Sequence, residues 1–380
     1  MSIPELSATQ LLATLEAHPG SPGPQILDVR APARAALGHI EAPDYRNVPG
    51  SRVLPLADAA ELGLDRGRPV IVVCDRGMSS RPVAQHLQRQ GFDARSLAGG
   101  MLAWMLATVP RPVAGVASLD RLVQVDRVGK GALGYFAARG GEALVVDPGR
   151  DLAPYEALLT ESGARLVGVV DTHCHADYLS GGPALAAAHG VPYLLHPEDA
   201  VDPYSGRPVR IPFTPLAGGA ELAVGDARFA VEHLPGHTEG SIVLRLGDEI
   251  ALTGDFLFIE SVGRPDLAGR TAAWTVRLWE SLQSARRRWS PGLRVLPAHY
   301  SAERERQASR VVEGRFGDLA VRNPPLAIAD AAEFTAWIAA RSGAFPEEYR
   351  YIKQANLGWG EISPELADEL EAGRNQCAIS

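Results

Sequence analysis

Seven consecutive residues, Thr172-His173-Cys174-His175-Ala176-Asp177-Tyr178, carry two histidines and an aspartate at alternate positions. They follow residues 166–170, whose β-branched and apolar side chains predict a buried strand. In a short loop after such a strand, side chains at this spacing can point into one cavity. Imidazole and carboxylate groups are usual ligands of zinc and iron. The chain is therefore expected to fold so that the end of a strand carries a metal site.

Further histidine and aspartate residues follow other predicted strands later in the sequence. They are found in Pro235-Gly236-His237-Thr238, Thr253-Gly254-Asp255 and Pro297-Ala298-His299. Taken alone, each is typical of a turn or of a hydrogen-bonded surface residue. Together they predict one shared metal centre, because α/β folds commonly carry their catalytic and binding residues on loops that follow strands. The spacing does not distinguish iron from zinc.

A second chemical signal lies near the N-terminus, where a cysteine separates a predicted strand (69–74) from a predicted helix (79–90). Backbone N–H groups and a helix N-terminus lower the pKa of a thiol in such a loop, and Arg76 and Arg81 add positive charge. Cys74 is therefore a candidate nucleophile; the alternative is a small buried residue that ends a strand. The loop consists of Cys74, Asp75, Arg76, Gly77, Met78, Ser79 and Ser80.

Strands and helices alternate twice along the chain, which indicates two α/β units. We expect an N-terminal domain over residues 1–110, a linker over 111–118 and a second domain over 119–380. Further strands are predicted at 25–29, 91–97 and 144–147, with a hairpin formed by 242–246 and 249–252. The stretch after about 325 is expected to be mostly helical, and the last ten residues are expected to fray.

Composition excludes several classes of partner. The net charge of −8 argues against a nucleic-acid surface, and no apolar run has the length of a membrane span. The N-terminus lacks the pattern of a signal peptide. Cys74, Cys174 and Cys377 form no paired framework, which is typical of a reducing cytoplasm. A cytoplasmic enzyme acting on small molecules is expected.

The metal motif resembles that of the metallo-β-lactamase superfamily, His-x-His-x-Asp-His followed by later His, Asp and His. Gly263-Arg264-Pro265-Asp266-Leu267 also resembles a segment of the glyoxalase II and persulfide dioxygenase branch. The resemblance covers roughly residues 119–325. It implies an αββα sandwich with the metal at one edge. Domains of this kind commonly form homodimers, and a homodimer is expected here only on that analogy.

Tyr178 stands where the binuclear hydrolases of this superfamily have a histidine. A neutral phenol is a poor zinc ligand at pH 7, so the second metal site is expected to be lost. The resemblance to persulfide dioxygenases implies one Fe(II) per chain, held by His173, His237 and Asp255, with zinc as the alternative. His175, Asp177, Tyr178 and His299 are expected around the ligands or the substrate. Arg264 would either meet a cosubstrate carboxylate or form a structural ion pair.

The N-terminal part resembles a single rhodanese domain over about residues 5–108. The resemblance is carried by Leu27-Asp28-Val29-Arg30, Gly38-His39-Ile40, the Cys74 loop and Gly99-Gly100-Met101-Leu102-Ala103-Trp104. It implies that Cys74 accepts a sulfane sulfur and that Asp28 and Arg30 stabilise the fold. Ser79 stands where many rhodaneses have arginine, so the sulfur donor is left open.

The two resemblances together predict a persulfide dioxygenase–rhodanese fusion. It would use O₂ and a low-molecular-weight thiol persulfide, with glutathione persulfide as the first candidate, and would handle thiosulfate or sulfite at Cys74. One alternative is a glyoxalase II-like zinc thioesterase, in which zinc hydroxide attacks an acylated thiol. Another is a sulfur carrier with a structural metal; open coordination positions disfavour it, because structural zinc sites are usually closed.

Overall fold

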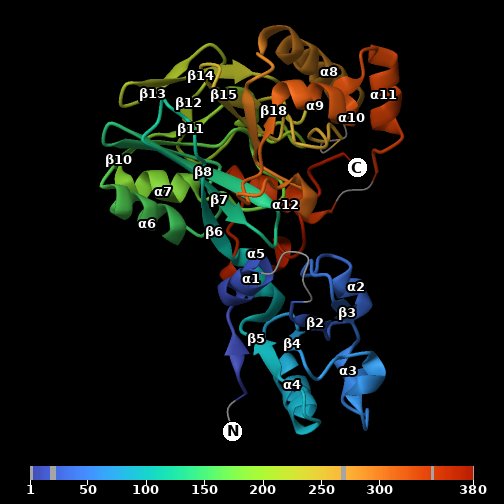
Figure 1. Ribbon diagram of the computed structural model, residues 1–380. Helices are drawn as coiled ribbons and strands as arrows, with labels where there is room; N and C mark the ends of the chain where they lie inside the picture. The colour runs from blue at the N-terminus through green and yellow to red at the C-terminus, as the bar shows by residue number, and fades with distance from the viewer. Residues whose placement is uncertain (1–2, 18–22, 267–270, 344–345, 380) are drawn as a thin grey trace. The chain divides into compact units, whose positions relative to one another are not determined.

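The computed structural model describes residues 3–17, 23–266, 271–343 and 346–379 (Figure 1). The chain divides into two compact units. The first contains Met1–Val109, Arg127–Lys130 and Ala372–Arg374, and the second contains Pro110–Asp126, Gly131–Glu371 and Asn375–Ser380. In the described parts of the chain, no helix combines the length and the apolar character that a bilayer span requires.

The first unit is built on a parallel sheet with the strand order β1-β5-β4-β2-β3. The central strands β2 and β4 are buried along their whole length, as is expected for a parallel sheet covered on both faces. The strands are β1 (Glu5–Leu6), β2 (Gln25–Asp28), β3 (Tyr45–Asn47), β4 (Val70–Val73) and β5 (Ala94–Leu97). The helices are α1 (Ala8–Ala17), α2 (Pro32–Ala35), α3 (Gly50–Val53), η1 (Ala59–Leu62), α4 (Ser80–Arg89) and α5 (Gly100–Leu106).

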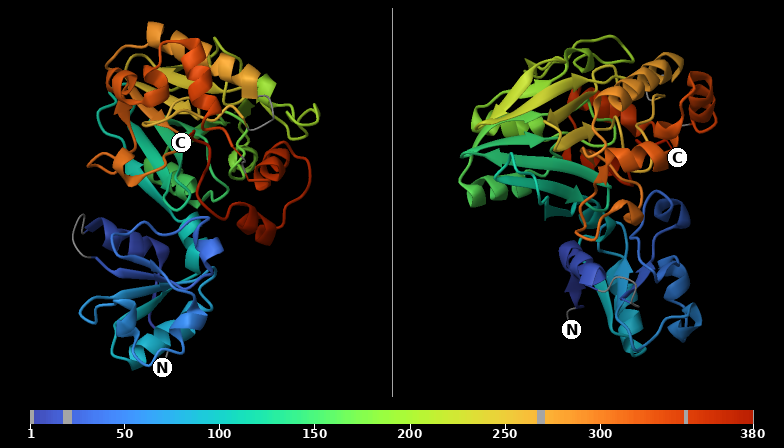
Figure 2. Two further views of the ribbon diagram at one scale, coloured as in Figure 1. Left: turned by 90° about the vertical axis from the view of Figure 1, so that its right-hand side faces the viewer. Right: turned by 45° about the horizontal axis from the view of Figure 1, so that its top comes forward.

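The second unit contains two sheets that lie face to face (Figure 2). One has the order β12-β11-β10-β9-β8-β7-β6 and the other β13-β14-β15-β16-β17-β18. The strands of the first are β6 (Thr108–Pro112), β7 (Arg121–Arg127), β8 (Ala132–Arg139), β9 (Glu142–Val146), β10 (Arg165–Val170), β11 (Tyr193–Leu195) and β12 (Thr214–Pro215). Those of the second are β13 (Glu221–Val224), β14 (Ala227–His233), β15 (Ile242–Leu246), β16 (Ile250–Gly254), β17 (Arg294–Pro297) and β18 (Gly314–Arg315).

Helices cover the outer face of each sheet in this unit. The sheet that contains β10 is covered by α6 (Ala153–Ser162) and α7 (Gly182–His189). The other sheet packs against a group led by α8 (Thr271–Arg288). The remaining helices are η2 (Pro197–Asp199), η3 (Glu303–Glu305), α9 (Phe316–Arg322), α10 (Pro324–Ala327), α11 (Ala331–Ala339), α12 (Glu348–Asn356) and α13 (Pro364–Leu370).

Alternating side chains of each central strand divide between two cores. On β15, Leu244 points into the core between the sheets, while Val243 points into the core beneath α8. On β9, Val146 faces the inter-sheet core and Val145 faces α6 and α7. Because successive side chains in a strand point to opposite faces, strands that are apolar throughout must be covered on both sides. The result is a helix–sheet–sheet–helix sandwich.

Two expectations for the ends of the second unit differ from the structure. Residues 111–118, expected as a linker, begin inside β6 and contribute buried Val113 and Val116 to the inter-sheet core. The expectation that the last ten residues fray is wrong for those that are described. Ile379 N–H donates to the Val262 carbonyl and Cys377 is fully buried. The bond between Ile379 and Val262 joins positions more than a hundred residues apart, so local composition does not reveal it.

Candidate functional site

His173, His237 and Asp255 come together from three separate loops. His173 lies after β10, His237 in the turn between β14 and β15, and Asp255 after β16. Asp255 Oδ2 lies 3.6 Å from His173 Nε2 and 3.4 Å from His237 Nε2. All three side chains are buried, and one ligand atom from each lies within 4.8 Å of the others. The three predicted ligands therefore converge on one point.

The chemistry of this cluster fits a metal ion. Among the described residues, His173 Nε2 and Asp255 Oδ2 are buried without a hydrogen-bond partner, an arrangement that costs free energy unless a ligand satisfies them. His237 Nδ1 lies 3.0 Å from the Arg264 carbonyl, which leaves Nε2 directed at the centre. Burial is the main cause that lowers the pKa of both imidazoles. Neutral imidazoles are the form that binds metals.

Beside this cluster, His299 lies between two carboxylates. Its Nδ1 lies 2.6 Å from Asp255 Oδ1 and its Nε2 lies 3.0 Å from Asp177 Oδ2. Burial disfavours a charged ring, but Asp177 and Asp255 outweigh it and raise the pKa of His299 to about 10. Cys377, from the end of the chain, offers a sulfur atom within 4.8 Å of ligand atoms of Asp177 and His299. Sequence reasoning missed this thiol because it expected the end of the chain to fray.

His175 and Tyr178 belong to a third buried group, centred on Asp147. His175 Nε2 lies 3.1 Å from Asp147 Oδ1 and 3.0 Å from the Tyr178 hydroxyl. The Tyr178 ring stacks on the His175 ring at 4.3 Å, and its hydroxyl donates to the Asp147 carbonyl at 3.3 Å. Asp147 also accepts the Thr172 N–H at 2.7 Å, which ties β9 to the motif loop. The sequence Asp147-Pro148-Gly149, with which the predicted strand 144–147 ends, was the available signal for Asp147.

Asp199 connects the two loops that carry the histidine ligands. Its carboxylate accepts the N–H of Cys174 at 2.7 Å, the hydroxyl of Thr238 at 2.7 Å and the N–H of Gly240 at 2.8 Å. One carboxylate thus fixes residues adjacent to both His173 and His237.

Close packing also explains why residue 263 is a glycine, because a Cβ there would lie 2.0 Å from the Asp255 carbonyl.

Helix α12 supports the motif loop from the C-terminal part of the chain. Asn356 Nδ2 donates to the carbonyls of His175 and Tyr178, both at 2.9 Å. Lys353 is three residues earlier on the same helical face and is 3% exposed. Its positive charge is a lesser cause, after burial, of the lowered pKa of both His173 and His237. The positive charge of Lys353 therefore acts on both histidines of the metal centre, which the sequence motifs did not predict.

Arg264 forms the structural ion pair that was one of its two expected roles. Its guanidinium binds Asp266 at 2.6 and 2.8 Å and the Gly343 carbonyl at 2.9 Å. The expectation that it meets a cosubstrate carboxylate is not supported, because the fork of the side chain is occupied within the fold. Its backbone carbonyl instead orients His237. Leu267, the last residue of the segment that begins at Gly263, lies outside the described residues.

In the first unit, Cys74 lies at the base of the loop between β4 and α4. Its sulfur lies 3.1 Å from the Ser80 hydroxyl, which lies 2.8 Å from the Ser96 hydroxyl. Burial tends to raise the pKa of the Cys74 thiol, but hydrogen bonds from Ser79, Ser80 and backbone N–H groups, including that of Arg76, outweigh it and lower this pKa. The loop therefore favours a thiolate, the nucleophilic form.

The other residues of the loop and its flanks are held by contacts elsewhere in this unit or are exposed. Gly77 has a positive φ of 76°, and Met78 at the tip is 68% exposed. Asp75 lies 3.3 Å from Arg34. The exposed side chain of Arg81 pairs with Glu5 at 2.8 Å. Asp28 and Arg30, which were expected to stabilise the fold, form a buried ion pair at 2.6 Å.

Replacing Ser80 with alanine should raise the pKa of Cys74, because a hydroxyl that stabilises the thiolate is removed. The rate of Cys74 alkylation by iodoacetamide should reach half its plateau at a higher pH than in the unchanged protein. Ser96→Ala, which removes only the second hydroxyl, should produce a smaller change in the same direction. An unchanged pH profile in Ser80→Ala would mean that the backbone N–H groups alone stabilise the thiolate.

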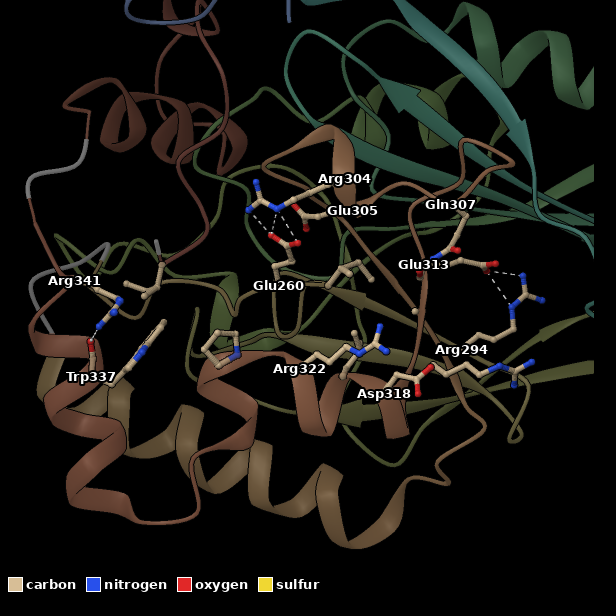
Figure 3. A pocket seen from close by; sticks show the side chains of 16 residues that line it. Glu260, Arg294, Arg304, Glu305, Gln307, Glu313, Asp318, Arg322, Trp337 and Arg341 are labelled. Atoms are coloured by element: carbon tan, nitrogen blue, oxygen red, sulfur yellow. Dashed lines mark hydrogen bonds and ion pairs between the residues drawn. The ribbon is translucent and has the colours of Figure 1, made fainter. Parts of the chain in front are cut away.

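A separate cavity of about 730 Å³ lies against β18, α9 and α11 (Figure 3). Ion pairs within the fold occupy two of its arginines, Arg304 with Glu260 and Arg294 with Glu313. Arg341 lies over the Trp337 ring at 4.3 Å. None of the predicted metal ligands lines this cavity, so it is distinct from the metal centre.

Comparison with protein families gives two matches. Residues 130–309 match the model described as the metallo-beta-lactamase superfamily, and residues 11–107 match the model of the rhodanese-like domain. The crystal structure of ETHE1 from Myxococcus xanthus superimposes with a TM-score of 0.53 at 23% identity. It covers 63% of this chain and 99% of that one. Together with the sheets described above, these matches confirm the expected fold class, a parallel-sheet α/β domain plus an αββα sandwich.

Two relatives are named for different activities. A hydroxyacylglutathione hydrolase of Anaeromyxobacter dehalogenans is 39% identical over 46% of this chain and 63% of its own length. The mitochondrial persulfide dioxygenase ETHE1 of Homo sapiens is 36% identical over 33% of this chain and 47% of its own length. The chain thus spans less than two thirds of either relative.

Proposed function

Because this chain joins a rhodanese-like domain to a domain of the metallo-beta-lactamase superfamily, we propose that it is a persulfide dioxygenase with a sulfurtransferase domain. The outer sulfur of a low-molecular-weight thiol persulfide, with glutathione persulfide as the first candidate, is oxidised by O₂. One persulfide, one O₂ and one water give one thiol, one sulfite and two protons. The relative named persulfide dioxygenase supports this choice.

The observation that carries the proposal is the buried convergence of His173, His237 and Asp255. Two imidazoles and one carboxylate with open positions suit non-haem Fe(II). Tyr178 does not replace the missing histidine as a metal ligand, because its hydroxyl is hydrogen-bonded to the Asp147 carbonyl and to His175. We therefore propose one Fe(II) per chain. Bound there, iron would supply the activation of O₂, which protein side chains cannot provide.

The chain's own residues would exclude water, fix the ligands and bind the substrate. All three ligands are buried, Asp199 holds the two histidine loops together and His299 orients Asp255 through a 2.6 Å contact. We propose that the Lys353 ammonium binds the anionic end of the persulfide, because its positive charge acts on both histidine ligands. These roles place the substrate beside the metal without involving Arg264.

At Cys74 we propose a sulfur transfer without net oxidation. The thiolate attacks the outer sulfur of thiosulfate, an S–S bond forms at Cys74, and the donor S–S bond breaks with its electron pair leaving on sulfite. An acceptor thiolate then takes the outer sulfur and restores the Cys74 thiolate. The lowered pKa of Cys74 and its Ser80 contact support this role.

Purification without oxygen followed by two assays tests the proposal. One assay measures O₂ uptake with glutathione persulfide, the other hydrolysis of S-lactoylglutathione, and bound iron and zinc are counted in the same sample. Stoichiometric iron with persulfide-dependent O₂ uptake is expected. Zinc with thioester cleavage would favour the hydrolase suggested by the 39% identical relative. The absence of both activities would indicate a sulfur carrier with a structural metal. Two iron ions per chain would contradict the single-iron centre.

Lys353→Met should raise KM for glutathione persulfide by about tenfold or more, since a hydrogen bond to a charged group contributes roughly 1.5–3 kcal/mol. Iron content and kcat should change little if Lys353 acts only in binding. Lys353→Arg keeps the positive charge and should restore most of the affinity. Steady-state O₂ uptake at varied persulfide concentration checks this. An unchanged KM in Lys353→Met would exclude Lys353 from substrate recognition.

A further inference from the structure

Another cluster of metal-ligating side chains lies outside the proposed centre, after β11 and at the end of β14. His196 follows β11 and caps the short helix η2, and His233 ends β14. Their rings stack with centroids 4.0 Å apart and planes 20° apart. Glu198 Oε2 lies 3.6 Å from His233 Nε2. One ligand atom from each of the three residues lies within 4.8 Å of the other two.

One nitrogen of each ring contacts the backbone. His196 Nδ1 accepts the Glu198 N–H at 3.3 Å, which leaves Nε2. His233 Nε2, the nitrogen 3.6 Å from Glu198 Oε2, lies 2.7 Å from the Glu239 carbonyl, and an ion bound by this nitrogen would replace that contact. Solvent can reach the cluster, since the side chains of His233 and Glu198 are 27% and 50% exposed. A divalent cation placed here would meet two imidazoles and a carboxylate, with water completing its coordination.

We propose that His196, Glu198 and His233 form a surface binding site for a zinc-type transition-metal ion. Two nitrogen donors select zinc, nickel or copper over magnesium and calcium, which prefer oxygen ligands. The two imidazoles come from different segments of the fold and stack on each other, so both rings would turn to direct a nitrogen at one ion, which would then join η2 to the end of β14.

This position connects the site to the proposed metal centre. Asp199, next to Glu198 in η2, accepts hydrogen bonds from Cys174 N–H and the Thr238 hydroxyl. His233 is four residues before His237 on the other supporting segment. An ion that joins η2 to β14 would therefore stabilise the two supports of the histidine loops, whatever reaction the centre performs.

Addition of Zn²⁺ to the iron-loaded full chain tests the site. Zinc affinity is measured by competition with a chromophoric chelator, and the melting temperature and the retained iron are followed in the same samples. The unchanged protein should bind one zinc without releasing iron and should melt at a higher temperature. His233→Asn should weaken this binding by about tenfold or more, by comparison with the roughly 10–100-fold that outer-shell partners contribute.

His189→Asn is the matched control, because His189 is also a partly exposed histidine beside a glutamate, 3.0 Å from Glu156. It should bind zinc like the unchanged protein. If His233→Asn fails to fold, Glu198→Gln alters only an exposed carboxylate and should still weaken binding. The proposal would be overturned if Glu198→Gln bound zinc as tightly as the unchanged protein. It would also be overturned if zinc bound only as iron was released.

Discussion

Asp255→Ala should lose its iron and, with it, all persulfide-dependent O₂ uptake. Asp255 contributes the carboxylate that lies 3.4 Å from His237 and 3.6 Å from His173, and two buried imidazoles alone cannot hold the ion firmly. Since outer-shell partners alone contribute roughly 10–100-fold to metal affinity, removal of a ligand should weaken iron binding by more than about 100-fold. Metal analysis after gel filtration checks this.

Asp177→Asn is the control that separates a ligand from a supporting residue. Asp177 is as buried as Asp255 but lies next to His299, 3.0 Å from Nε2, outside the three-residue cluster. This variant should keep most of its iron and fold like the unchanged protein. Full iron content and activity in Asp255→Ala, or equal loss in both variants, would show that the ligand assignment is wrong.

Sequence periodicity predicted the elements that carry the chemistry because each has a strong local signal. The strand predicted at 69–74 is β4 (Val70–Val73), and the helix predicted at 79–90 is α4 (Ser80–Arg89). The predicted hairpin around Gly247 forms between β15 and β16. The strand predicted from Gly91 begins only at Ala94, since Gly91 has a positive φ of 83° and forms a turn.

The supporting residues of the metal centre could not be predicted in the same way. Lys353, Asn356 and Cys377 come from the C-terminal part of the chain, about 180 to 200 residues after the motif they support. Their role follows from where α12 and the last residues pack, which depends on the complete tertiary fold. Arg264 shows the opposite case, because the choice between a ligand contact and an ion pair depended on Asp266 two residues away.

Cys74→Ser should abolish transfer of sulfur from thiosulfate, with a loss of roughly 10³-fold or more, because serine oxygen cannot carry the outer sulfur as a persulfide. The cradle of Ser79, Ser80 and backbone N–H groups stabilises a thiolate, and an un-ionised serine hydroxyl gains little from it. Cyanide-dependent thiocyanate formation measures the transfer. Cys174→Ala is the matched control, because burial raises the pKa of that thiol, and it should transfer sulfur normally.

The same Cys74→Ser protein should keep its iron and should consume O₂ at the unchanged rate when glutathione persulfide is supplied directly. This follows because Cys74 lies in the first unit, whereas His173, His237 and Asp255 all belong to the second. With thiosulfate and thiol as the only sulfur source, O₂ uptake should instead fail, since the persulfide is no longer made. Loss of O₂ uptake even with added persulfide would mean that Cys74 takes part in the oxidation itself, and the two units could not then be treated as separate catalysts.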